Sequence, residues 1–210
     1  MPRSQHRRWR SATALAALAF ALVFPLQPVA AGGPSHGDRI ARIVDQLGSE
    51  VDPYAAFAAL PEREQLAVKE YLKVTTYADS VPSMSPSGTD GEISIAASGC
   101  WTWKWQRDGR NSLGALLWSY FQQINWCGNG SVITSTPQRT RWGEVYVPFW
   151  SWGHIGNETW GGVNQPSYRA WTQGEFKLCL TPNVGCVQNR YPWLDMTAWA
   201  NGQGTGSVGG

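Results

Sequence analysis

The side chains best suited to molecular recognition in this chain are its tryptophans. Twelve of the 13 tryptophans lie between residues 101 and 199. Indole rings stack flat on other apolar surfaces, so a row of them suits the C–H faces of sugars. The segment 99–210 has little room to bury twelve indoles, so we expect some of them to form an exposed binding surface. The candidate ligand-binding residues are Trp101, Trp103, Trp105, Trp150 and Trp152. The competing interpretation is that the indoles fill the core of a small sheet domain.

Catalytic chemistry has fewer candidates. His154 and Glu158 lie four residues apart in a glycine-rich stretch and could form an acid–base pair. Glycoside hydrolysis instead needs two placed carboxylates. The acidic residues after position 99 are Asp108, Glu144, Glu158, Glu175 and Asp195. No nucleophile elbow, P-loop or zinc-protease motif occurs. The sequence therefore favours a non-catalytic protein, with an extracellular hydrolase as the alternative hypothesis.

Metal, cofactor and nucleic-acid binding are not expected. After residue 31 the histidines are His36 and His154, and the cysteines are better explained as disulfides. Once the four N-terminal arginines are removed, 13 basic residues face 15 acidic ones, without the clusters that phosphate contacts need. The expected partner is a glycan or another cell-surface component. A third hypothesis is a secreted toxin or interaction protein whose exposed tryptophans insert at a membrane interface.

The first 31 residues predict a secretory signal peptide. Four arginines precede an apolar run from Ala12 to Leu26, and small residues end the segment at Ala31. This basic, apolar, small order is typical of a cleaved signal peptide. The run contains Pro25 and is shorter than the roughly 20 apolar residues that span a bilayer. We therefore expect cleavage after Ala31, secretion, and no membrane-spanning segment in the mature protein.

Four cysteines after the signal segment predict two disulfides, because an exported protein meets an oxidising environment. Three pairings are possible. Cys100 and Cys127 are each out of phase with the tryptophans of their strands, which puts both sulfurs on one side if the strands are neighbours. Cys179 and Cys186 flank a Pro-Asn turn. We therefore predict the pairs Cys100–Cys127 and Cys179–Cys186.

The elements that position these residues fall into three segments after the signal peptide. Residues 32–78 have helical spacing, which predicts a helix over 38–47 capped by Asp38 and two further short helices. Such short helices either pack on another element or form a weakly stable arm. Residues 79–98 are a Ser/Pro/Gly-rich linker by composition. The helical spacing ends there, and a β domain over 99–210 follows.

The β domain consists of stretches in which apolar and polar residues alternate, and turn residues separate these stretches. Strands are predicted over 101–105, 116–126, 132–134, 142–152, 168–180 and 185–199. A helix over 113–124 is an alternative, but the aromatic content and the Asn129-Gly130 turn favour a strand. The glycine-rich end after Ala200 is expected to fray. The pattern predicts a mainly β fold, an antiparallel β-sandwich or open barrel, preceded by a short α-helical N-terminal segment.

The layout as a whole resembles one group of proteins. The helical stretch LPEREQLAVKEYL at 60–72, the WCGNGSVIT hairpin at 126–134 and the FKLC…GC…YPW end carry the resemblance. They are similar to small exported actinobacterial proteins of unknown function, over most of the chain after the signal peptide. The resemblance implies an extracytoplasmic β domain with paired cysteines, and it carries over no catalytic residue.

Overall fold

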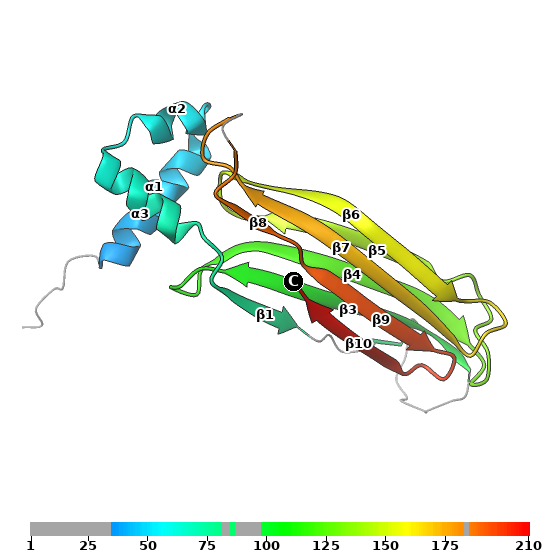
Figure 1. Cartoon of the computed structure of the whole chain (residues 1–210). Helices are drawn as coiled ribbons and strands as arrows, with labels where there is room; N and C mark the ends of the chain where they lie inside the picture. Colours follow the sequence, from blue (N-terminus) through cyan, green and yellow to red (C-terminus); the bar gives the residue numbers. More distant parts are fainter. Residues whose placement is uncertain (1–34, 81–84, 87–97, 183–184) are drawn as a thin grey trace, which may run out of the picture. The chain divides into compact units, whose positions relative to one another are not determined.

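The computed structural model of the chain describes residues 35–80, 85–86, 98–182 and 185–210. The predicted signal peptide, residues 1–31, and most of the predicted linker over 79–98 lie outside the described residues. All described elements belong to one unit of the chain, Pro34–Gly210, in which three helices precede the strands (Figure 1).

The three predicted helices are confirmed. They are α1 (His36–Ser49), α2 (Pro53–Ala58) and α3 (Glu62–Tyr71). Ser35, rather than the predicted Asp38, caps α1. The Asp38 amide donates to Ser35 Oγ at 3.1 Å, and the Ser35 amide donates to Asp38 Oδ2 at 3.0 Å. This reciprocal pair satisfies two amides at the helix start, so α1 begins before the predicted position.

Strands make up most of the described chain. They are β1 (Thr76–Ser80), β2 (Ser85–Pro86), β3 (Gly99–Arg110), β4 (Leu116–Gly128), β5 (Gln138–Val145), β6 (Trp150–Gly161), β7 (Ser167–Leu178), β8 (Gln188–Arg190), β9 (Trp193–Trp199) and β10 (Gly204–Gly209). The first sheet has the order β1-β3-β4-β5, and β2 also pairs with β3. The second sheet has the order β10-β9-β7-β6, and β8 also pairs with β7 (Figure 1). Every strand pairing is antiparallel.

The inner faces of the two sheets pack against each other. The rings of Trp118 on β4 and Phe176 on β7 are stacked, with centroids 4.2 Å apart. A hydrogen bond of 2.7 Å joins the hydroxyls of Tyr120 and Thr172 across the same gap. The predicted mainly β fold is therefore confirmed, and its two antiparallel sheets have a sandwich-like arrangement.

The helical segment packs on the β-sandwich and is not a separate arm. Trp150, the first residue of β6, donates from Nε1 to the Leu72 carbonyl just after α3 at 2.9 Å. The ring of Phe149 packs edge-on against Tyr54 and Phe57 of α2, with centroids 5.3 and 5.6 Å apart. These contacts bury aromatic surface that short helices could not bury by themselves.

Several predicted strand bounds need correction. The predicted strand 142–152 is two strands in different sheets, because the chain turns at Phe149, whose φ is +70°. Residues 132–134 form no strand: Ile133 makes only isolated bridges, and β5 is the strand that returns beside β4. The predicted strand 185–199 is interrupted before β9 at Pro192, which cannot donate a ladder hydrogen bond. The alternative helix over 113–124 does not form.

The glycine-rich C-terminal residues do not fray; they form β10 at the edge of the second sheet. Gly204 and Gly206 face the first sheet, where they receive the indoles of Trp103 and Trp105. A Cβ built on Gly206 would lie 1.9 Å from Trp105 Cζ3, and one on Gly204 would lie 2.8 Å from Trp103 Cε3. The missing side chains make the room that the two indoles occupy.

Both predicted disulfides are confirmed. Cys100 on β3 and Cys127 on β4 are direct cross-strand partners and are bonded. Cys179 and Cys186 close the turn that follows β7. The first bond ties the central strands of one sheet together, and the second ties β7 to the segment that leads into β8.

Candidate functional site

The structure does not bring the five predicted tryptophans together on one exposed surface. Trp103, Trp105 and Trp150 are buried, with 3%, 7% and 7% of their surface exposed. Trp101 is half-buried, and Trp152 is 42% exposed. These three indoles therefore lie in the core, as the competing interpretation expects, and form no part of an exposed surface. Trp103 and Trp105 stand on the apolar side of β3, and that side faces the opposite sheet.

His154 and Glu158 do not form the predicted acid–base pair. Residues four apart on a regular strand share a face, but β6 has a bulge between His154 and Gly156. The extra residue turns the side chains after it to the opposite face of the sheet. His154 therefore faces the gap between the sheets, where its Nδ1 accepts from Arg141 Nε at 3.2 Å. Glu158 stands on the outer face, opposite Trp171 of β7.

Exposed and half-buried tryptophans gather instead on the outer face of the second sheet. Along β7, Arg169, Trp171 and Gln173 alternate with residues that face the core. Trp160 of β6 is the cross-strand partner of Arg169, and Trp193 of β9 is the partner of Gln173. The three indoles therefore cross three neighbouring strands diagonally, with successive Cα atoms about 8 Å apart at ordinary strand spacing and rise. We call Trp160, Trp171 and Trp193 the tryptophan platform.

Glycines on neighbouring strands let two platform rings lie along the sheet. A Cβ built on Gly156 of β6 would lie 2.9 Å from Trp171 Cζ3. A Cβ built on Gly209 of β10 would lie 2.5 Å from Trp193 Cζ2. Each ring therefore rests on glycine backbone, which covers part of the indole and leaves the rest to solvent. Both residues are accordingly half-buried.

Hydrogen-bonding groups lie beside the platform. Arg169 Nε donates to Asp195 Oδ1 at 2.9 Å, and its Nη2 donates to Oδ2, so the ion pair is forked. The Arg169 guanidinium also lies 4.8 Å from the centroid of the Trp160 ring. A shallow hollow beside the ion pair is completed by Thr197, Thr205, Gly206 and Ser207. The arrangement suits a ligand that has both apolar faces and hydroxyl groups.

The first sheet's outer face holds two of the carboxylates considered for hydrolysis. Asp108 is 3% exposed and accepts from the Ser119 hydroxyl at 2.6 Å. Glu144 accepts from the Tyr146 hydroxyl at 2.6 Å and from Trp142 Nε1 at 2.9 Å. These two hydrogen bonds, that of Tyr146 first, lower the pKa of Glu144. A general acid needs a raised pKa, so Glu144 does not suit that role.

The second sheet's carboxylates are also unsuited to acid–base work. Asp195 is bound by Arg169, and Glu175 forms an ion pair with Lys177 at 2.8 Å. Glu158 stands two strands away from Asp195, with Trp171 between them. The hydrolase hypothesis therefore gains no support from the carboxylates of the β domain.

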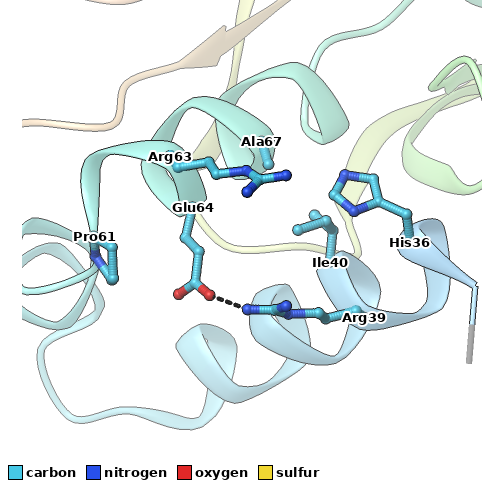
Figure 2. A pocket seen from close by; sticks show the side chains of 7 residues that line it. All are labelled: His36, Arg39, Ile40, Pro61, Arg63, Glu64 and Ala67. Carbon is cyan, nitrogen blue, oxygen red and sulfur yellow. Dashed lines mark hydrogen bonds and ion pairs between the residues drawn. The ribbon is translucent and has the colours of Figure 1, made fainter.

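A hollow between α1 and α3 is a further depression on the described surface. Its lining, shown in Figure 2, is His36, Arg39, Ile40, Pro61, Arg63, Glu64 and Ala67. Glu64 accepts a hydrogen bond from Arg39 across the hollow (Figure 2). This ion pair joins the two helices, and exposed pairs of this kind are common structural contacts. We assign the hollow no chemistry.

Replacing His154 with glutamine is expected to flatten the pH dependence of stability. Burial, and then Arg141 and Arg139, lower the pKa of His154 below its ordinary value near 6.5. The folded state then binds the proton less readily than the unfolded state, so stability falls as pH drops below that ordinary value. The check is the melting temperature between about pH 7.5 and 5.5, with His36→Gln as the control. Equal slopes in His154→Gln and the parent protein would contradict the expectation.

The sequence prediction did not include the platform residues, because it considered how many tryptophans the segment holds and not on which side of its strand each one lies. Arg169 and Gln173 flank Trp171 two residues away on either side, so Trp171 stands in the polar phase of its strand. Alternation alone could have placed this indole outside the core. Trp193 shares its phase with Asp195 and could have been found in the same way.

Fold and disulfides together define the class: a disulfide-bonded antiparallel β protein of two sheets, with helices at the start of its described part. Among the described helices, none is long and apolar enough to cross a membrane. In the described residues, no group of three or more His, Cys, Asp or Glu side chains could hold a metal ion. No family model, curated protein or solved structure matches this chain.

Proposed function

We propose that this protein is an exported, non-catalytic module that binds glycan through the tryptophan platform. The observation that carries the proposal is the diagonal of three indoles on the outer face of the second sheet, two of them laid on glycine backbone. A ring held along a sheet presents a flat apolar surface with little conformational entropy to lose on binding. Sugar rings offer matching C–H faces.

The polar surroundings support a saccharide ligand. Arg169 and Asp195 hold each other in a forked ion pair, so their remaining donor and acceptor positions are fixed beside the rings. Thr197, Thr205 and Ser207 add hydroxyls to the same hollow. Neutral sugars need such paired donors and acceptors, because each hydroxyl both gives and takes a hydrogen bond.

Export is part of the proposal. Two disulfides are compatible with a protein that folds outside the reducing cytoplasm. The signal-peptide pattern of residues 1–31 supports cleavage after Ala31 and secretion. A glycan partner on a cell surface or in the surrounding matrix fits that location.

The double variant Trp171→Ala/Trp193→Ala is expected to lose binding to insoluble polysaccharide, by roughly tenfold or more. Both indoles supply the flat contact area, and alanine removes it without creating a core cavity, since both side chains are half-buried. The measurement is a pull-down on chitin, cellulose and peptidoglycan, followed by isotherms on whichever polymer the parent protein binds.

The matched control is Trp142→Ala, which removes a half-buried indole from the outer face of the first sheet. It is expected to bind as the parent protein does. Retention of the double variant equal to that of the parent, or no binding of the parent to any polymer, would count against the platform. Leakage of dye from lipid vesicles caused by the parent protein would instead favour the membrane-interface hypothesis.

A further inference from the structure

The open edge between β5 and β6 carries side chains that the platform does not use. These two strands end their sheets on the same side and lie next to each other (Figure 1). Arg139 and Arg141 of β5 are the cross-strand partners of Ile124 and Gln122 of β4, which are fully buried between the sheets. Both arginines therefore enter the gap between the sheets at its edge, where both are half-buried.

Both arginines contact neutral groups. Arg139 Nη2 donates to Asn157 Oδ1 at 2.6 Å, and its Nη1 donates to the Glu158 backbone carbonyl at 3.3 Å. Arg141 donates from Nε to His154 Nδ1 at 3.2 Å. In the described part of the chain, neither guanidinium has a carboxylate within ion-pair distance. By contrast, Arg169 is neutralised by its aspartate.

Two like charges are thus held together where water screens them poorly. Burial is the main cause that lowers the pKa of Arg139, and the charge of Arg141 adds to it. His154 supplies no counter-charge, since imidazole is neutral or positive. A bound anion would offset both the repulsion and the partial loss of hydration. The two positive charges at this edge therefore favour the binding of a negatively charged group.

An indole completes this edge. Trp152 stands two residues before His154, on the same face of β6, and 42% of it is exposed. A Cβ built on Gly143 of β5 would lie 2.7 Å from Trp152 Cδ2, so the ring lies over glycine backbone. Gly143 follows Arg141 by two residues on the same face of β5. A flat apolar ring thus lies along the edge that holds the guanidinium pair.

We propose that the β5–β6 edge binds the oxyanion of an acidic saccharide. The guanidinium groups of Arg139 and Arg141 contact the charged oxygens, and Trp152 packs against the sugar ring. Carboxylate and sulfate share this chemistry, because both accept forked hydrogen bonds from guanidinium. Within the described residues Arg141 donates only from Nε, so its Nη donors are available to the ligand. The indoles of the platform lie on the outer face of the second sheet and take no part in this site. Its contact with a platform residue is the hydrogen bond of 3.4 Å from Arg139 Nη1 to the Trp171 backbone carbonyl, which Trp171→Ala keeps.

The test is the melting temperature of the full mature protein with D-glucuronate, glucose 6-sulfate, glucose or inorganic sulfate, at matched ionic strength. Ligands that bind the folded state raise this temperature. At least one acidic sugar is expected to raise it further than glucose does, since glucose has no charged oxygens for the two guanidinium groups; the acid that acts distinguishes carboxylate from sulfate. Arg141→Gln is expected to weaken the apparent affinity for that sugar by roughly tenfold or more.

Two further variants separate ligand binding from folding. Arg63→Gln removes one exposed positive charge from α3 and is expected to respond as the parent does. Trp152→Ala keeps both guanidinium groups and is expected to weaken the response to the acidic sugar but not the response to inorganic sulfate. In chloride buffer without sulfate or carboxylate, Arg141→Gln is expected to melt at or above the parent temperature, because it removes a like-charge repulsion.

Three results would overturn the proposal: no response of the parent to either acidic sugar, an equal response of Arg141→Gln, or a response to inorganic sulfate alone. A markedly lower melting temperature of Arg141→Gln in the same chloride buffer would also overturn it, by showing that the guanidinium holds the sheets together. The variant Trp171→Ala/Trp193→Ala is expected to keep the acidic-sugar response. Failure of one site is therefore distinguishable from failure of the other.

Discussion

Replacing Trp118 with alanine is expected to lower the free energy of unfolding by about 3–5 kcal/mol, the range for deleting a large buried aromatic side chain. Trp118 is fully buried and stacks on Phe176 of the second sheet, with ring planes 14° apart. Trp150 meets it edge-on with centroids 6.3 Å apart. A Cβ built on Gly109 would lie 2.3 Å from Trp118 Cε2, so the indole also rests on the neighbouring strand. Urea unfolding followed by circular dichroism measures the loss.

Trp160→Ala is the matched control, because Trp160 is 44% exposed and carries no core contact of this kind. Its expected cost is below about 1 kcal/mol, as for most surface substitutions. If both variants lost the same free energy, the stacking of Trp118 between the sheets would not be a main source of stability. Trp150 also bonds Leu72 after α3, so the loss of Trp118 is expected to loosen the packing of the helices as well.

The side of its strand on which each tryptophan stands explains why three of the five predicted ligand-binding indoles are buried although the fold class was confirmed. On β3, Trp103 stands between Thr102 and Lys104, so its indole shares the apolar face that packs on the second sheet. On β7, Trp171 stands in the polar phase with Arg169 and faces solvent. The composition indicates that the core cannot hold every indole. The alternation of apolar and polar residues along each strand decides which indoles lie outside it.

Other features depend on contacts that local sequence does not encode. The bulge after His154 arises from how β6 pairs with β7, and it separates His154 from Glu158 although their spacing predicts a shared face. The C-terminal glycines are ordered as a strand, instead of frayed, because of a contact that is also distant in sequence. Gly206 is small enough for Trp105, a residue about one hundred positions earlier. Alternation along the strands and the cysteine pairing could be predicted, whereas the cap of α1 is Ser35 instead of the predicted Asp38.

Matching of indoles to glycines resolves the difficulty of packing so many tryptophans into so small a domain. Trp103 and Trp105 lie on glycines of β10 within the core, and Trp171 and Trp193 lie on glycines of the outer face. A ring on bare backbone needs less depth than a ring on side chains. The same arrangement therefore packs indoles tightly between the sheets and leaves flat indole faces outside them, where we propose that glycan binds.

Removing the Cys100–Cys127 disulfide with paired serines is expected to cost about 3–4 kcal/mol, and removing Cys179–Cys186 about 2–3 kcal/mol. The two bonds close loops of different length, with sequence separations of 27 and 7 residues. A longer loop restricts the unfolded chain more, so its bond contributes more to stability. Denaturant unfolding of the two paired-serine variants, in parallel with the parent protein, measures both losses.

The two losses can be compared directly because both bonds belong to one chain, and the first bond lies in the sheet that does not carry the tryptophan platform. Cys100 and Cys127 join β3 to β4 in the first sheet, whereas the platform lies on the second. The variant lacking Cys100–Cys127 is therefore expected to keep polysaccharide binding wherever it remains folded. If the short loop proved the more costly to open, restriction of the unfolded chain could not be the dominant effect. Local packing around the turn after β7 would then have to supply the difference.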